Sequence, residues 1–236
     1  MKLEWDKAGE REYEQGVSKG VLFKKTESDP YGTGVAWNGL TNVTESPEGA
    51  ELTDLYADGI KYASLRSVET YKATIEAYMY PDEFAECDGS AEPLPGIRLG
   101  QQKRAPFGFC FRSEIGNDQE QAGDGDYILT LIYGASASPS ERTHATINDG
   151  ADVESMSWEV ATTPVAVPGY KPTACMKIYS NKFTAQKMAA LEAILYGKDA
   201  AAAVGVEGEP GYVAAVVATV PRLPLPAEVI ALLGAA

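Results

Sequence analysis

A period-two alternation of apolar and polar residues is the feature that most constrains how this chain folds. Residues 156–162 read Met-Ser-Trp-Glu-Val-Ala-Thr, and residues 72–80 read Lys-Ala-Thr-Ile-Glu-Ala-Tyr-Met-Tyr. Successive side chains of a β-strand point to opposite faces of a sheet, so this period indicates strands with one buried face. We expect Trp158 and Ile75 to face a core, and Glu159 and Glu76 to face outward.

Further strand candidates are rich in Val, Ile, Thr, Tyr and Phe, which suit a pleated, half-buried surface. They are residues 17–24, 34–44, 60–80, 107–112, 127–133 and 173–179. Asp-Gly pairs at 58–59, 88–89, 124–125 and 149–150, and Pro-Gly pairs at 95–96 and 168–169, supply the turns. This pattern predicts a mainly β fold, a β-sandwich or partial barrel of two packed sheets with extended loops or arms.

One flanking α-helix is predicted at about residues 184–196. Thr184 is a suitable N-cap, and Gly197 can end the helix. Met188, Leu191, Ile194 and Leu195 form an apolar stripe that can pack on a sheet. A second, short helix is expected after Pro226, and residues 199–211 are expected to form an Ala/Gly-rich loop. We divide the chain into a β-sandwich domain with an N-terminal arm (1–199) and a C-terminal arm with a short helix (200–236).

The charge balance limits the kinds of partner. The 236 residues include 34 acidic and 20 basic ones, for a net charge of −14. Wrapping a nucleic-acid backbone needs clustered Lys and Arg, so we expect no specific DNA binding. The charged N-terminal residues predict no secretory signal, and the interrupted apolar region near the C-terminus predicts no membrane span. Three widely spaced cysteines suggest a protein made in a reducing cytoplasm.

Sequence motifs for enzyme chemistry are absent. The single histidine, His144, lies in a turn-like segment, and no serine stands in a G-x-S-x-G elbow. Asp124 and Asp126 are close carboxylates, but the other ligands of a calcium loop are missing. Phosphate-binding glycine motifs do not occur either. We therefore expect no catalytic residues, no cofactor and no metal; an acid–base hydrolase that uses a pair among the many carboxylates stays open as an alternative.

Two features suggest contacts between subunits. Thirteen tyrosines against six phenylalanines favour half-buried, hydrogen-bonding surfaces, and Tyr78 and Tyr80 lie on the polar side of their strand. Residues 98–112 carry four bases and no acid, while the stretches around them are acidic. The candidate inter-subunit residues are Tyr78, Tyr80, Arg98, Lys103, Arg104 and Arg112. Solvated loops, or a carbohydrate-binding platform built on the tyrosines, are the alternatives.

Several segments resemble a known family. Residues 34–51 (GVAWNGLTNVTESPEGAE) and 73–89 (ATIEAYMYPDEFAECDG) are similar to the major tail proteins of siphophages and of related prophages of Gram-positive bacteria. Shorter similar stretches lie at 20–23, 55–62, 147–149, 157–165 and 223–233. The resemblance implies a β-sandwich with a flanking helix, whose copies join into rings, usually hexamers, that stack into a tube through which DNA passes. It also implies a virion location, no catalytic residues, and tail-tip, tape-measure and tail-terminator proteins as partners.

The combined expectation is a structural tail tube subunit that assembles with copies of itself. In such a tube an acidic lining would repel DNA phosphates, and we predict that Glu76 and Glu159 face the lumen. The alternative is a receptor- or carbohydrate-binding β-sandwich of the same virion.

Overall fold

The computed structural model describes residues 2–26, 31–119, 125–144, 146, 153–201, 203 and 215–234. Within these ranges the first strands are β1 (Tyr13–Lys24), β2 (Gly34–Trp37), β3 (Leu40–Glu45), β4 (Leu52–Ala57), β5 (Ile60–Arg66) and β6 (Lys72–Ala77). They are followed by β7 (Ala91–Leu94), β8 (Ile97–Leu99), β9 (Phe107–Gly116), β10 (Tyr127–Ala137), β11 (Met156–Thr162) and β12 (Cys175–Tyr179). The helices are α1 (Ala185–Tyr196) and α2 (Pro226–Gly234), with short 3-10 turns at η1 (Asp82–Glu86) and η2 (Ser180–Lys182). The predicted mainly β class is confirmed.

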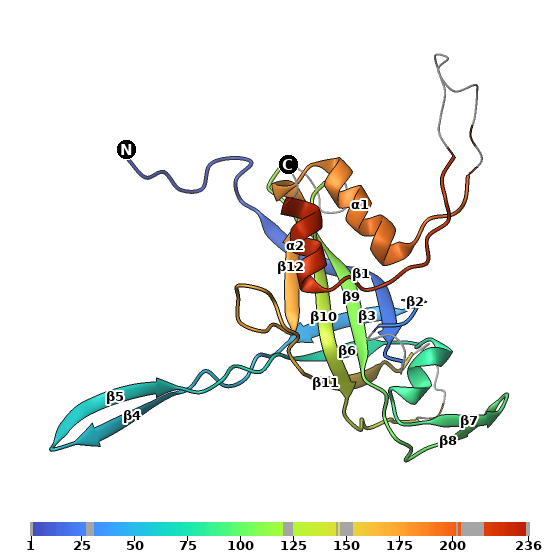
Figure 1. Ribbon diagram of the computed structural model, residues 1–236, viewed down its shortest axis with the longest axis horizontal. Coiled ribbons are helices and arrows are strands. Elements are labelled where there is room, and N and C mark those ends of the chain that lie inside the picture. Colours follow the sequence, from blue (N-terminus) through green and yellow to red (C-terminus); the bar gives the residue numbers. More distant parts are fainter. Residues whose placement is uncertain are drawn as a thin grey trace.

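The body has three layers (Figure 1). Strands β2, β1, β9, β10 and β12 form a five-stranded antiparallel sheet, and β3, β6 and β11 form a three-stranded one. A short pairing of residues 135–137 of β10 with residues 160–162 of β11 joins the two sheets at one corner. The third layer consists of α1 and α2. This arrangement is the predicted sandwich or partial barrel, in which α1 is the predicted flanking helix and α2 is the short second helix expected after Pro226.

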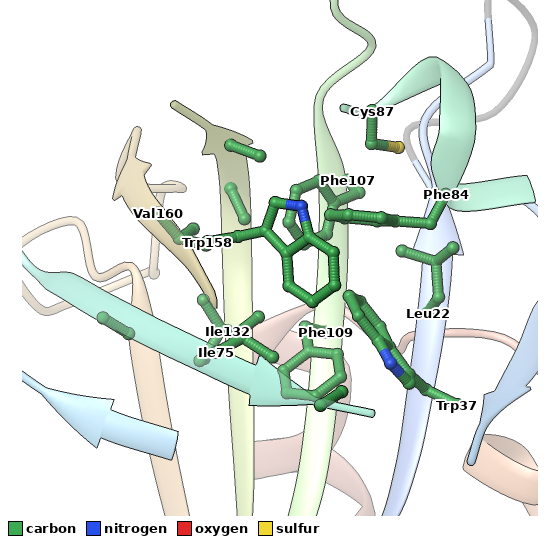
Figure 2. Close-up of a cluster of buried hydrophobic side chains, with 14 of the residues drawn as sticks. Leu22, Trp37, Ile75, Phe84, Cys87, Phe107, Phe109, Ile132, Trp158 and Val160 are labelled. Atoms are coloured by element: carbon green, nitrogen blue, oxygen red, sulfur yellow. The ribbon is translucent and has the colours of Figure 1, made fainter. Parts of the chain in front are cut away.

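The first core lies between the two sheets and is rich in aromatic rings. Trp158 of β11 is fully buried, and its ring centroid lies 5.7 Å from that of Trp37 and 5.3 Å from that of Phe84 (Figure 2). The Trp37 indole N–H donates a hydrogen bond to the Met79 carbonyl at 2.9 Å. Because edge-to-face aromatic pairs fill space with little freedom to slide, this cluster fixes how the sheets face each other.

The second core lies between the five-stranded sheet and the helices. On β1, Leu22 points into the first core, whereas Val21 and Phe23 point toward the helices. The helices contribute the apolar stripe Met188, Leu191 and Leu195 of α1, and Val229 and Leu233 of α2. Three of the four predicted stripe residues of α1 are therefore confirmed, whereas Ile194 is only half-buried and is not part of this core. Thr184, which accepts a hydrogen bond from the Lys187 N–H, is confirmed as the N-cap, and Gly197 as the C-cap.

Two strand boundaries differ from the sequence-based expectation. Residues 34–44 form two strands, because Gly39 adopts a φ of +80° between β2 and β3. Residues 60–80 also form two strands, β5 and β6, which belong to different sheets. The turn at 149–150, and most of the expected loop at 199–211, lie outside the described residues. The predicted division at residue 199 stays a prediction; α2 packs on the same core as α1.

Candidate subunit interfaces

The single histidine and the three cysteines occupy positions that do not favour nucleophilic chemistry. His144 is exposed in the segment after β10. Burial raises the pKa of the Cys87 and Cys110 thiols to about 12, and that of the Cys175 thiol to about 11. All three thiols are therefore protonated at neutral pH, and it is the thiolate that acts as a nucleophile.

The carboxylates considered as metal ligands do not gather into a site. In the part of the chain that the structure describes, no three His, Cys, Asp or Glu residues are placed to hold a metal ion. Asp124 lies outside that part. Asp126 accepts a hydrogen bond from the Ser180 hydroxyl at 3.0 Å, and the same hydroxyl accepts one from the Tyr127 N–H at 2.8 Å. Asp126 therefore connects the start of β10 to the end of β12.

The outer side of the three-stranded sheet is polar. Strand register places on this side Asn42, Thr44, Lys72, Thr74, Glu76, Ser157, Glu159 and Ala161, which we call the polar face. Ser157 pairs with Glu76, and Glu159 pairs with Thr74. The structure thus brings the two predicted lumen residues onto one surface. Large apolar side chains are absent from this set, so the face is suited to contact with water or with a moving polar polymer.

A long hairpin made of β4 and β5 extends away from the body (Figure 1). Cross-strand pairing divides its side chains into two sets. Thr53, Leu55, Ala57, Ile60, Ala63 and Leu65 form one side, which we call the apolar hairpin face. Ile60 is 66% exposed and Leu65 is 56% exposed, although side chains of this kind are usually buried.

The opposite side of the hairpin is mixed: it carries Leu52 and Tyr56 beside an internally bonded polar group. The Asp54 carboxylate accepts a hydrogen bond from the Ser64 hydroxyl at 2.6 Å and pairs with the Lys61 ammonium at 2.8 Å. These two contacts hold the pKa of Asp54 below its ordinary value. An isolated two-stranded hairpin is marginally stable in water. A projecting hairpin that leaves Leu55, Ile60 and Leu65 uncovered on one side therefore indicates a contact surface for another molecule.

The prediction that Tyr80 lies on the polar side of its strand is wrong: β6 ends at Ala77, and the Tyr80 ring packs on the first core, 5.5 Å from the Trp158 ring centroid. Two guanidinium groups contact Tyr80. Its hydroxyl accepts hydrogen bonds from Arg98 at 2.9 Å and from Arg142 at 3.4 Å, and both guanidinium carbons lie within 5.5 Å of the ring centroid. Arg98 is also ion-paired with Asp82. Since Arg98 belongs to β8 and Asp82 to η1, these contacts fix the base of the β7–β8 hairpin.

Asp88 bridges Arg104 and Arg142. Its carboxylate lies 3.5 Å from Arg104 and 2.6 Å from Arg142, and only 13% of its side chain is exposed. Arg104 also donates to the Ala137 carbonyl at 3.2 Å. Arg104 therefore has partners within its own chain, as Tyr80 and Arg98 do. Their predicted role between subunits stays a prediction.

The remaining candidate residues are Arg112, Lys103 and Tyr78. Arg112 is ion-paired with Glu114 at 2.8 Å and lies over the Tyr127 ring at 3.8 Å. Burial opposes the charge of Arg112, but the hydrogen bond and the charge of Glu114, together with the nearby Tyr127 and Glu192, outweigh it and raise the Arg112 pKa. Lys103 is exposed, and Tyr78 is 51% exposed. Of the six predicted residues, these last two have the most accessible side chains.

The sequence analysis did not identify the apolar hairpin face. It also did not identify Arg142 as a residue that contacts Tyr80 and Asp88. Arg142 is the one basic residue between positions 114 and 159, a stretch with ten acidic residues. A lone base in such a stretch is a usable signal for an internal ion pair. The apolar hairpin face has no equivalent signal, because its alternation is the same as that of a core strand.

Several strand edges are unpaired. In the described ranges β2 pairs only with β1, β3 only with β6, and β12 only with β10. Residues 156–158 of β11 also lack a partner on the side away from β6. Unpaired N–H and C=O groups along an edge can accept a strand from another chain.

Comparison with models of known protein families finds no match to this chain, and comparison with curated proteins finds none either. Within the described ranges, no helix has both the length and the apolar character needed to cross a membrane. We therefore base the functional proposal on the fold, the surfaces described above and the resemblance of the sequence segments.

Proposed function

We propose that this chain is the major subunit of a non-contractile phage tail tube, a structural protein that assembles with copies of itself. The observation that carries the proposal is the apolar hairpin face on β4 and β5. Each Leu or Ile side chain that another copy buries fully contributes about 1.5–3 kcal/mol. A projecting hairpin can reach a neighbouring copy without any change in the body of the subunit.

The unpaired edges support ring formation. A ring needs two different surfaces on each copy that fit each other. The free edge of β3 on one copy and residues 156–158 of β11 on the next are such a pair, because they lie on opposite sides of the same three-stranded sheet. Joining them would continue the sheet around a cylinder.

The polar face supports a conduit for DNA. If the three-stranded sheets close into a cylinder with their apolar sides in the subunit cores, the polar face becomes the lining. Glu76 and Glu159 then repel phosphates, and the small polar residues beside them offer no aromatic ring on which bases can stack. DNA would pass without being held.

Electron microscopy of the concentrated purified chain tests the proposal, both alone and with a tail-tip initiator from the same virion. We expect tubes of uniform width with a central channel. A discrete small oligomer that binds glycans saturably would instead support the receptor- or carbohydrate-binding alternative. Substrate turnover with a bell-shaped pH profile would identify a hydrolase.

A further inference from the structure

An apolar groove lies between the outer edge of β12 and helix α2. Its volume is about 520 Å³, and Met176, Ile178, Phe183, Ile230 and Leu233 contribute apolar lining. Ile230 is 45% exposed and Phe183 is 37% exposed, so the apolar side chains are open to solvent. The groove borders a strand that is hydrogen-bonded on one side only. An added strand could bond to β12 and place alternate side chains in the groove.

The N-terminal arm has the pattern of such a strand. Residues 3–6 read Leu-Glu-Trp-Asp, so Leu3 and Trp5 fall on one side of an extended chain, and Glu4 and Asp6 on the other. Leu3 is 71% exposed and Trp5 is 76% exposed. A tryptophan is the residue type most often found as the anchor of a protein interface, and here it lies uncovered in its own chain.

The alternation of side chains in the N-terminal arm matches the alternation on β12. On β12, Met176 and Ile178 face the helix layer, while Lys177 between them faces the other way. A strand beside β12 with Leu3 and Trp5 toward the helices therefore places Glu4 on the same side as Lys177. Lys182 also lines the groove, is exposed, and forms no ion pair with any described residue. Lys177 is already ion-paired with Glu45 at 2.8 Å, so Lys182 is the cation that the acidic side of the arm can meet.

The arm is held so that its tip stays away from its own groove. The Gly9 N–H donates to the Asp118 carboxylate at 2.8 Å, and Arg11 lies 3.8 Å from the same carboxylate. Beyond this attachment, residues 2–6 extend away from the body, and Figure 1 shows the N-terminal end well separated from α2 and β12. In this arrangement the arm leaves its own groove open to another copy.

We infer that residues 2–6 of one copy add a strand to β12 of a second copy, with Leu3 and Trp5 in the groove against α2. This inference rests on the proposed function, because it names one of the contacts that hold the assembly together. A strand of five residues is a weak interface on its own. In a ring or a stack the same contact repeats on every copy, so weak contacts sum to a stable polymer.

Disulfide trapping between full-length copies tests the contact directly. Leu3→Cys is placed on one copy and Ile230→Cys on a second copy with a different tag, and the two are mixed and oxidised. Both positions are exposed, so neither change disturbs the core. We expect a mixed disulfide that joins the two tags, and none when Ile230→Cys is replaced by Val217→Cys, an exposed control position outside the groove.

A substitution series gives the second readout. Trp5→Ala should raise the protein concentration needed for assembly about tenfold, as expected for the loss of a single anchor. Trp5→Phe should change it about twofold or less, and Ile230→Arg should act like Trp5→Ala.

The outcomes separate this inference from the proposed function. Tubes that form at the same concentration with Trp5→Ala, with no mixed disulfide, would overturn the arm contact and leave the tube function intact. A mixed disulfide without tubes would support the arm contact and count against the tube. A link found only within single chains carrying both cysteines would overturn the exchange between copies.

Discussion

Glu76 of β6 and Glu159 of β11 lie diagonally across neighbouring strands on the same side of the three-stranded sheet. Side chains in this diagonal relation are about 7–8 Å apart at the backbone. Glu159 is exposed and Glu76 is half-buried, so at that spacing water and salt weaken their repulsion to a modest value. Repeated around a cylinder, such pairs form acidic bands along its inner surface.

The first prediction concerns these carboxylates. The double change Glu76→Lys and Glu159→Lys should leave the fold and tube assembly unchanged, because both side chains point away from the core. It should slow genome delivery, because cations on the lining attract phosphates. The measurement is DNA release from particles carrying the variant. Reversal of an exposed acid in η1, Glu83→Lys, is the control; normal delivery by the double variant would show that the lining charge is irrelevant.

The second prediction uses two leucines of the β4–β5 hairpin. Leu65 is 56% exposed on the apolar hairpin face, and Leu52 is 55% exposed on the opposite side. Leu65→Ser should raise the concentration needed for assembly at least about tenfold, whereas Leu52→Ser should change it little. Neither should alter monomer stability by more than about 0.5 kcal/mol, because both side chains are exposed. Sedimentation of assembled material measures the first effect and thermal unfolding the second.

An equal effect of the two serine substitutions on assembly would contradict a face-specific role for the hairpin. Loss of monomer stability in Leu65→Ser alone would indicate that the apolar hairpin face packs within its own chain.

The sequence predicts local structure in this protein better than it predicts which surfaces stay bare. The alternation in residues 156–162 correctly predicts a strand with Trp158 buried. Thr184 as the N-cap and Gly197 as the C-cap correctly predict where α1 begins and ends. These signals work because cap bonding and side-chain period are properties of a few consecutive residues.

The hairpin could not be predicted in the same way. Residues 52–57 and 60–66 mix apolar and polar residues as half-buried strands do, and only the three-dimensional arrangement shows that no part of the described chain covers them. The partners of Arg104 and Tyr80 could not be predicted from the sequence either. Arg104 pairs with Asp88, and Tyr80 contacts Arg142; Asp88 and Arg142, which pair with each other, lie 54 residues apart in the chain. A charge pattern predicts that Arg104 needs an acid and does not say which one.

The third prediction compares two aspartates of the arginine network. Asp88 is 13% exposed and pairs with Arg104 and Arg142, whereas Asp82 is 85% exposed and pairs with Arg98. Asp88→Asn should lower the free energy of unfolding by about 1.5–3 kcal/mol, because it weakens charged hydrogen bonds in a poorly solvated place. Asp82→Asn should cost less than about 1 kcal/mol, as expected for an exposed pair. Denaturant unfolding of both variants measures the difference, and equal costs would contradict it.

The last prediction concerns Gly134, the residue at which β10 changes its pairing partners. Its φ is +58°, and the strand register shifts between Ile132 and Ala135, so that Ile132, Ala135 and Ala137 all reach the first core. A Cβ at this position would lie 2.3 Å from the Thr163 carbonyl oxygen, which is part of the backbone and has little freedom to move. We expect Gly134→Ala to cost about 3 kcal/mol or more, because backbone strain and a steric clash act together. Gly169 has a φ of +78° and open space around it, so Gly169→Ala isolates the strain and should cost about 1 kcal/mol. Thermal unfolding of the two variants checks the order; if Gly169→Ala proves as damaging as Gly134→Ala, then the close approach to Thr163 contributes nothing to the need for glycine.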